Sequence, residues 1–254
     1  MTAVYVLIVL VATTVGSCAG IGGGIIIKPC MDLVQADPLM VISFYSTSAV
    51  FAMACLSSVR RLLKDKQFNY LLVVLISVSS VLGGFCGSQV MKFLTVFADE
   101  TVVRKTQAFM LCLMLVLLSL YYVKTPVSLR LQSHTIIFLV GFCLGLLSSF
   151  LSIGGGPANV AVFGYLFGFP LKICVTYSLT TIFFCQGAVL AGIMFTEGFS
   201  SYPCETLLFI IPAALCGSLV GSYLYRSMKD NQIRMLLVVT MGAVIAINVV
   251  NMVV

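Results

Sequence analysis

The feature of this sequence with the clearest chemical capability is a run of three glycines that occurs twice. The six residues are Gly22, Gly23, Gly24, Gly154, Gly155 and Gly156, and an isoleucine precedes each run. Three consecutive glycines disfavour a helix interior, because each costs about 1 kcal/mol relative to alanine. A helix that begins after such a break presents unpaired backbone N–H groups and a partial positive charge to one point. The pattern therefore predicts two sites that can hold an anion without a cationic side chain.

Close packing is the alternative explanation for the glycines. Glycine lets neighbouring helices approach, and a single small-residue motif serves packing more often than binding. Here Pro29 and Pro157 follow the two runs and strengthen the helix breaks. The absence of a Cβ atom also lets a ligand approach the backbone. Duplication next to proline therefore favours a binding site over packing alone.

Polar side chains downstream of each run are candidates to complete such a site. Asn159 lies about one turn beyond the second run, and its amide can donate to an oxyanion. Two matching sets of hydroxyl groups follow the runs: Tyr45, Ser46 and Ser48, then Tyr177, Ser178 and Thr180. Hydroxyls in apolar helices often bond to their own backbone, so both roles remain open. Lys28 can attract an anion or extend toward a lipid head group, and Val160 stands at the equivalent place after the second run.

The elements that position these groups follow from the composition. Of 254 residues, 61% are hydrophobic and 9% are charged, whereas soluble domains have about 25% charged residues. A membrane-spanning helix needs roughly 20 apolar residues, and two shorter apolar runs follow the glycines, at Gly24–Val34 and Pro157–Phe169. We predict an all-α, multi-pass integral membrane protein with about eight long transmembrane helices plus two broken or re-entrant segments. The eight long stretches are Thr2–Gly20, Leu39–Val59, Tyr70–Met91, Thr106–Val123, Thr135–Leu151, Ile173–Phe195, Leu207–Tyr225 and Met235–Val254.

The chain contains an internal repeat. The Ile-Gly-Gly-Gly motif recurs at an offset of 132 residues, and further matches follow at that offset: Pro38 with Pro170, Tyr45 with Tyr177, Ser46 with Ser178 and Phe51 with Phe183. Gly83, Gly87 and Ser88 match Gly217, Gly221 and Ser222 at an offset of 134. We predict two membrane repeats, 1–125 and 126–254, that form one domain, with a short polar linker over Lys124–Gln132.

Charge predicts that the two repeats are inverted. The loop after the second long helix contains Arg60, Arg61, Lys64 and Lys66, while the equivalent loop contains Glu197 and Glu205 and no basic residue. The positive-inside rule places these loops on opposite faces. A predicted external loop at Lys92–Lys105 disagrees, because it carries three basic residues. Inversion requires an odd number of crossings per half, so each short run either completes a broken crossing or makes the first helix re-entrant.

No catalytic or metal site is expected. The ten cysteines are scattered singly, without a CxxC pair, as is typical of small apolar residues between helices. His134 is the sole histidine, and the sequence has no HExxH motif. We therefore predict no enzyme, no cofactor and no metal.

The two glycine motifs resemble those of the TauE/SafE family of sulfite and organosulfonate transporters. The resemblance rests on Gly20 through Pro29 and on Ser152 through Asn159, and the two-half organisation extends it over nearly the whole chain. It implies a secondary carrier for sulfite or another sulfur-containing anion, in the cytoplasmic membrane if the source is bacterial. Inverted-repeat carriers bind substrate near the bilayer midplane and work by alternating access.

Several alternatives remain beside that carrier. A carboxylate proton relay has weak support, because Asp32 and Asp37 map to Gly164 and Phe169 in the second half. The expected partners are a small anion and membrane lipids, not nucleic acid. The sequence leaves open whether the protein forms a homo-oligomer. An anion channel or a carrier of an organic carboxylate would use the same breaks. A cysteine-based redox carrier would need matching cysteines, but Cys18 maps to Phe150.

Overall fold

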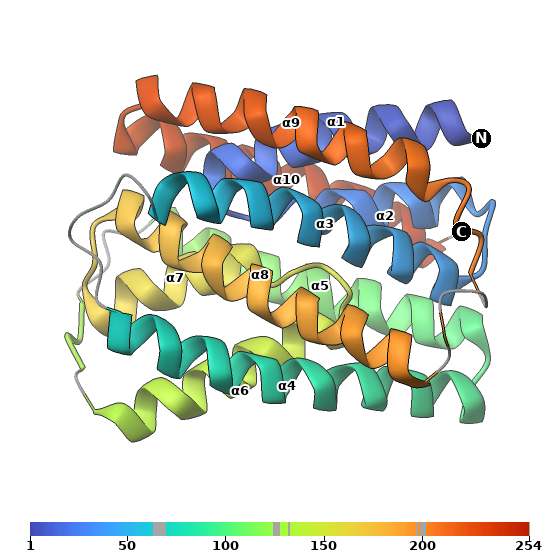
Figure 1. Ribbon diagram of the computed structural model, residues 1–254, viewed down its shortest axis with the longest axis horizontal. Coiled ribbons are helices and arrows are strands. Elements are labelled where there is room, and N and C mark those ends of the chain that lie inside the picture. Colours follow the sequence, from blue (N-terminus) through green and yellow to red (C-terminus); the bar gives the residue numbers. More distant parts are fainter. Residues whose placement is uncertain (63–69, 124–127, 132, 197, 199–201, 254) are drawn as a thin grey trace.

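The computed structural model describes residues 1–62, 70–123, 128–131, 133–196, 198 and 202–253 and arranges them as a layered bundle of helices (Figure 1). Lys64, Lys66, Glu197 and most of the predicted linker lie outside these ranges. The helices within them are α1 (Thr2–Ala19), α2 (Gly24–Val34), α3 (Leu39–Leu62), α4 (Tyr70–Phe97), α5 (Glu100–Val123), α6 (His134–Phe150), α7 (Gly156–Phe167), α8 (Leu171–Thr196), α9 (Leu207–Ser227) and α10 (Asp230–Val253).

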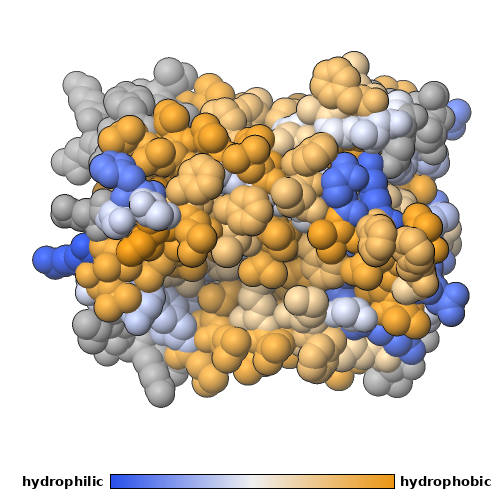
Figure 2. Space-filling view, turned by 90° about the horizontal axis from the view of Figure 1, so that it is seen from below, coloured by the Kyte–Doolittle hydropathy of each residue, from blue (hydrophilic) through white to orange (hydrophobic). Residues whose placement is uncertain are grey.

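The helices have the length and composition of membrane-spanning segments. Seven are long and apolar enough to cross a membrane, namely α1, α3, α4, α5, α8, α9 and α10, and α6 is a shorter apolar helix of 17 residues. Apolar side chains cover the middle of the face drawn in Figure 2, with hydrophilic side chains toward both ends. The prediction of an all-α, multi-pass integral membrane protein is confirmed.

The glycine breaks make the first helix of each half re-entrant. Tyr5, near the start of α1, donates to Asp37 after the end of α2 at 2.7 Å, so α2 returns to the end of the bundle where α1 begins (Figure 1). Before α6, the backbone N–H of Leu129 donates to the carbonyl of Tyr165 near the end of α7 at 2.8 Å. Of the two arrangements that the sequence left open, the structure has the re-entrant one.

Three full-length helices follow each re-entrant pair, and the two sets run in opposite directions. In Figure 1, α3 runs from the end of the bundle that holds the N-terminus to the other end, and α8 runs the opposite way. The same reversal holds for α4 with α9 and for α5 with α10. Since three crossings per half is an odd number, the second half is inverted relative to the first.

The two halves interlock through glycine-lined helix contacts. Helix α1 packs on α9, and its equivalent α6 packs on α4. A Cβ atom added to Gly221 would lie 2.2 Å from the carbonyl oxygen of Thr14, and one added to Gly87 would lie 2.3 Å from that of Leu146. Gly87 and Gly221 are equivalent in the repeat, and so are their contact residues Leu146 and Thr14. The glycines at the 134-residue offset therefore serve close packing between the halves.

The two ends of the bundle carry different charge. The end where α3, α5 and α9 finish, called here the basic end, has seven basic residues and one acid among the described residues: Arg60, Arg61, Arg130, Lys172, Arg226, Lys229, Arg234 and Asp230. The opposite end, called here the acidic end, has four basic residues and five acids: Lys28, Lys92, Arg104, Lys105, Asp32, Asp37, Asp99, Glu100 and Glu205.

The predicted extent of the external loop, Lys92–Lys105, is wrong. Helix α4 continues to Phe97 and α5 begins at Glu100, so Lys92 and Arg104 are helical. Arg104 bonds Glu100 at 2.9 Å and Asp32 at 3.3 Å, so its charge is balanced by neighbouring acids. The three basic residues of this segment therefore do not make the acidic end positive.

Candidate anion-binding site

Each break contains two successive glycines with positive φ, a region that glycine adopts readily. The φ angles are 84° and 67° at Gly22 and Gly23, and 78° and 63° at Gly154 and Gly155. A residue with a Cβ atom is disfavoured in this region. Both breaks therefore depend on glycine, although ψ is −35° at Gly23 and 9° at Gly155.

The breaks meet inside the bundle. A Cβ atom on Gly24 would lie 2.6 Å from the carbonyl oxygen of Ile153, and one on Gly156 would lie 2.1 Å from that of Ile21. Ile21 and Ile153 are the residues that precede the two glycine runs, so each run packs on the start of the other. This close approach needs glycine at both positions.

Two predicted hydroxyls hold the breaks in place. Ser46 on α3 donates to the carbonyl oxygen of Ser152 at 3.1 Å. Its equivalent, Ser178 on α8, donates to the carbonyl oxygen of Gly20 at 2.8 Å. Ser152 and Gly20 are themselves equivalent, so each half supports the break of the other half. These serines satisfy carbonyl groups that the interrupted helices cannot pair.

The breaks leave backbone donors without acceptors. The N–H groups of Gly22, Gly23, Gly154, Gly155 and Gly156 make no hydrogen bond within the described part of the chain. All five residues are buried. Buried backbone N–H groups are rarely left unpaired, and unpaired donors at the start of a buried helix suit an anion.

Gln186 on α8 adds a side-chain donor that the sequence analysis missed. It is 1% exposed, and neither its Nε2 nor its Oε1 atom has a partner among the described residues. Its Nε2 lies 3.6 Å from the place that a Cβ atom would take on Gly154. Ala54 occupies the equivalent position in the first half. The available signal was a single carboxamide within an otherwise apolar stretch of a long helix.

Comparison with known proteins agrees with this architecture. The family model for the sulfite exporter TauE/SafE matches residues 5–248, which include both breaks and all ten helices in whole or in part. The chain belongs to the TauE/SafE family. No curated protein and no solved structure gave a significant match. The family is one of membrane transporters, and its description names sulfite.

The remaining predicted residues lie near the TauE/SafE breaks in different ways. Asn159 is 2% exposed and its Oδ1 has no partner among the described residues. Thr180 donates to the carbonyl oxygen of Thr176 at 3.0 Å, which is the local bond that the sequence left open. Tyr45 donates to the carbonyl oxygen of Pro203 at 3.1 Å. Tyr177 packs against Phe163 and Phe169. The unpaired atom of Asn159 is an acceptor, so its Nδ2 group is the one that can donate to an anion.

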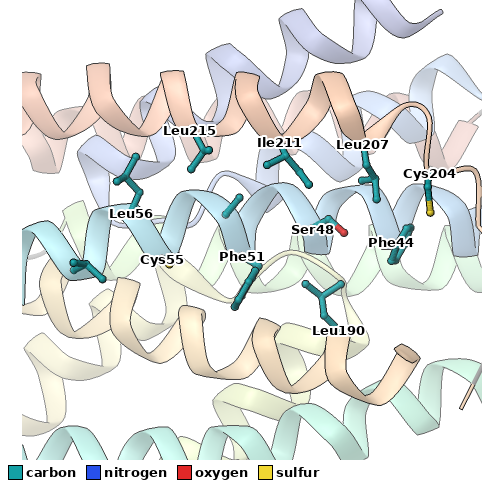
Figure 3. Close-up of a pocket in the computed structure, with 12 residues that line it drawn as sticks. Phe44, Ser48, Phe51, Cys55, Leu56, Leu190, Cys204, Leu207, Ile211 and Leu215 are labelled. Atoms are coloured by element: carbon teal, nitrogen blue, oxygen red, sulfur yellow. The ribbon is translucent and has the colours of Figure 1, made fainter. Parts of the chain in front are cut away.

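Ser48 lies apart from the breaks, in an apolar groove. The groove has a volume of about 630 Å3 and runs between α3, α8 and α9 (Figure 3). Apart from the Ser48 hydroxyl and two thiols, its lining is hydrocarbon, from residues such as Phe44, Phe51 and Leu190. Removal of an anion from water into such a groove would be costly. The groove suits a hydrocarbon chain and not the anion.

Lys28 is buried instead of reaching a lipid head group. It is 3% exposed, and its Nζ lies 2.8 Å from Oδ2 of Asp32, which is 5% exposed. Arg104 of α5 approaches the other oxygen of the same carboxylate at 3.3 Å. The charge on Lys28 is therefore balanced within the protein, four residues along α2 from Gly24.

Proposed function

We propose that this TauE/SafE protein is a secondary carrier that moves sulfite, or a related sulfur oxyanion or organosulfonate, across the membrane by alternating access. The proposed site is the meeting point of the two glycine breaks. The observation that carries it is the set of unpaired N–H groups at Gly154, Gly155 and Gly156 beside the buried carboxamide of Gln186. Asn159 and the N–H groups of Gly22 and Gly23 complete the proposed set of donors.

Neutral donors are suited to a carrier. A hydrogen bond to a charged group contributes about 1.5–3 kcal/mol, so several N–H groups can replace part of the water around an oxyanion. A buried cation beside the anion would bind it more tightly and slow its release. The helix starts at α2 and α7 direct their positive ends at the same region, as in other inverted-repeat carriers.

The inverted repeat supports the mechanism. We propose that residues 1–125 and 126–254 are the two repeats and that they act together as one transport domain without enzymatic activity. The excess of basic residues at the basic end supports a cytoplasmic location for that end. Equivalent re-entrant helices from opposite ends provide two related routes to one central site.

The experiment is anion flux in proteoliposomes. We expect saturable sulfite flux that sulfoacetate inhibits and chloride does not. Gly155→Ala should abolish the flux, since φ at Gly155 is 63° and its Cβ atom would lie 2.9 Å from Cβ of Ser148. Gly242→Ala on α10 is the matched control, because no atom lies within 4 Å of its Cβ position.

The same assay separates the alternatives. A flux that rises with concentration without saturation would indicate an anion channel instead of a carrier. Stronger inhibition by a carboxylate such as acetate would transfer the proposal to organic acids. Unchanged flux in Gly155→Ala would reduce the second break to a packing element and contradict the proposed site.

A further inference from the structure

Two pockets of similar size lie at opposite ends of the bundle. The first, of about 330 Å3, lies beside α7 at the basic end and is lined by residues that include Tyr121, Asn231 and Arg234. The second, of about 340 Å3, lies beyond α2 at the acidic end, and its lining includes Glu100 and Arg104. We call them the α7 pocket and the α2 pocket.

The two pockets are equivalent in the inverted repeat. The first turns of α5 and α10 align at an offset of 130 residues, which pairs Glu100 with Asp230 and Arg104 with Arg234. Each pocket is therefore lined by an acid in the first turn of a helix and by an arginine one turn later. The α7 pocket is also lined by Tyr121, near the end of α5, and the α2 pocket by Asn251, near the end of α10. These two residues match at the same offset of 130.

The pockets differ in depth. The α7 pocket is lined by Gly164 and by Val160, and Val160 is only four residues from Gly156, where the second break ends. The α2 pocket is lined by no residue of α2 itself, and the nearest lining residue is its C-cap, Gln35. Gln35 is eleven residues from Gly24, which corresponds to about 16 Å along a helix.

At the acidic end, ion-paired side chains stand at the α2 positions that correspond to the inner lining of the α7 pocket. Lys28 and Asp32 stand where the second half has Val160 and Gly164. The Asp32 carboxylate is bonded by Lys28 at 2.8 Å and by Arg104 at 3.3 Å. At the basic end the same space lacks both charged side chains, and a Cβ atom on Gly164 would lie 3.5 Å from the hydroxyl of Tyr121.

We propose that the α7 pocket is the access site through which a small oxyanion reaches the breaks from the basic end. We propose also that the Lys28–Asp32–Arg104 ion pairs close the equivalent route at the acidic end. This inference rests on the proposed carrier function. The guanidinium of Arg234, whose Nε donates to the carbonyl oxygen of Tyr122 at 2.6 Å, the amide of Asn231 and the hydroxyl of Tyr121 are of the donor types that suit an oxyanion. Asp230 is exposed at the mouth, at the N-terminus of α10, where the helix dipole offsets its charge.

The first experiment measures access without transport. The ten native cysteines are replaced by alanine, Gly164→Cys is introduced, and small methanethiosulfonate reagents are applied to the basic end of reconstituted vesicles. We expect faster modification by the sulfonate reagent than by the trimethylammonium reagent. Arg234→Gln should remove this preference and Arg234→Lys should keep it. No modification, or a preference that Arg234→Gln leaves intact, would overturn the access site.

A second measurement tests the closure. Lys28→Cys should resist modification from the acidic end while Asp32 and Arg104 remain paired. Adding Asp32→Gly, which copies the second half, should make that cysteine reactive. Because Lys28→Cys already removes the Lys28–Asp32 pair, this comparison tests the Asp32–Arg104 pair. If Lys28→Cys alone reacts as fast as the double variant, the Asp32–Arg104 pair does not close the route.

A third arm distinguishes a free anion from a lipid head group with the same chemistry. Sulfoacetate should slow modification of Gly164→Cys in vesicles of phosphatidylcholine alone. Slowing by phosphatidylglycerol but not by sulfoacetate would assign the pocket to lipid and overturn the access site. Because modification requires no transport, normal modification and protection in a protein without flux would count against the carrier and not against the pocket.

Discussion

Replacing Gln186 by methionine should raise stability and lower transport at the same time. The Gln186 carboxamide is 1% exposed and neither of its polar atoms has a partner among the described residues. Methionine keeps the length and flexibility of the side chain and removes the unpaired amide. A side chain that only filled space would move both properties in the same direction.

The magnitudes follow from the two states of the amide. In the protein without ligand, a buried polar group without a partner costs about 1–3 kcal/mol, so its removal should raise the melting temperature by a few degrees, at about 2–4 °C per kcal/mol. With ligand, the Nε2 donor bonds a charged oxygen, which contributes about 1.5–3 kcal/mol. Its loss should weaken anion binding roughly 10- to 150-fold.

The assay combines thermal unfolding in detergent with sulfite binding and flux. Ala54→Gln is the control, because it places the same carboxamide at the equivalent position in the first half. It should lower stability without increasing affinity for sulfite, since the breaks already have their donors. A Gln186→Met protein with unchanged affinity, or with lower stability, would refute the assignment of Gln186 to the site.

The remaining predictions concern the residues that support the breaks. Ser178→Ala should destabilise the protein by about 1–3 kcal/mol, because the carbonyl of Gly20 loses its donor, and Ser46→Ala should act similarly; equal melting curves would contradict this. Gly221→Ala should destabilise strongly, because its Cβ atom would lie 2.2 Å from the carbonyl oxygen of Thr14, whereas Gly242→Ala should not, as measured by denaturation. Asp32→Asn should lower stability by about 3–5 kcal/mol, because the buried Lys28 loses its counterion and Arg104 keeps only Glu100; a wild-type melting temperature would refute this.

Hydropathy predicted the long helices but not where the charged ones begin. The predicted Leu207–Tyr225 span agrees with α9, which ends only two residues later. By contrast, α5 was predicted from Thr106 and begins at Glu100. A stretch identified by its apolar residues ends at the first charged residues, whereas a helix continues as long as its backbone N–H and C=O groups form hydrogen bonds. Arg104 could remain helical because Glu100 and Asp32 neutralise it.

The breaks were readable from the sequence because glycine has a direct backbone consequence. Three glycines beside a proline predict a helix break whatever the surrounding fold. The structure around Gly22 and Gly154 therefore follows from the local sequence. The matching positions of Ser46 and Ser178 were also readable, but their roles were not. Each bonds a carbonyl in the opposite half, and a contact between halves depends on how the repeats pack. Gln186 was missed because nothing in the first half corresponds to it.

The departures from the repeat carry more information than the repeat itself. A perfectly symmetric inverted pair would have equal routes from both ends, and its two end-facing states would have equal energy. Lys28 and Asp32 occur only in the first half, and Val160 and Gly164 take their places in the second. Gln186 lies beside Gly154 of the second break, and Ala54 takes its place in the first half. In the proposed carrier, the ion pairs stabilise the state closed at the acidic end, because opening that route would separate charged groups. Bound anion must offset this cost through bonds that differ between the two states. We propose that the unpaired donors of Gly154 and Gln186 supply that difference.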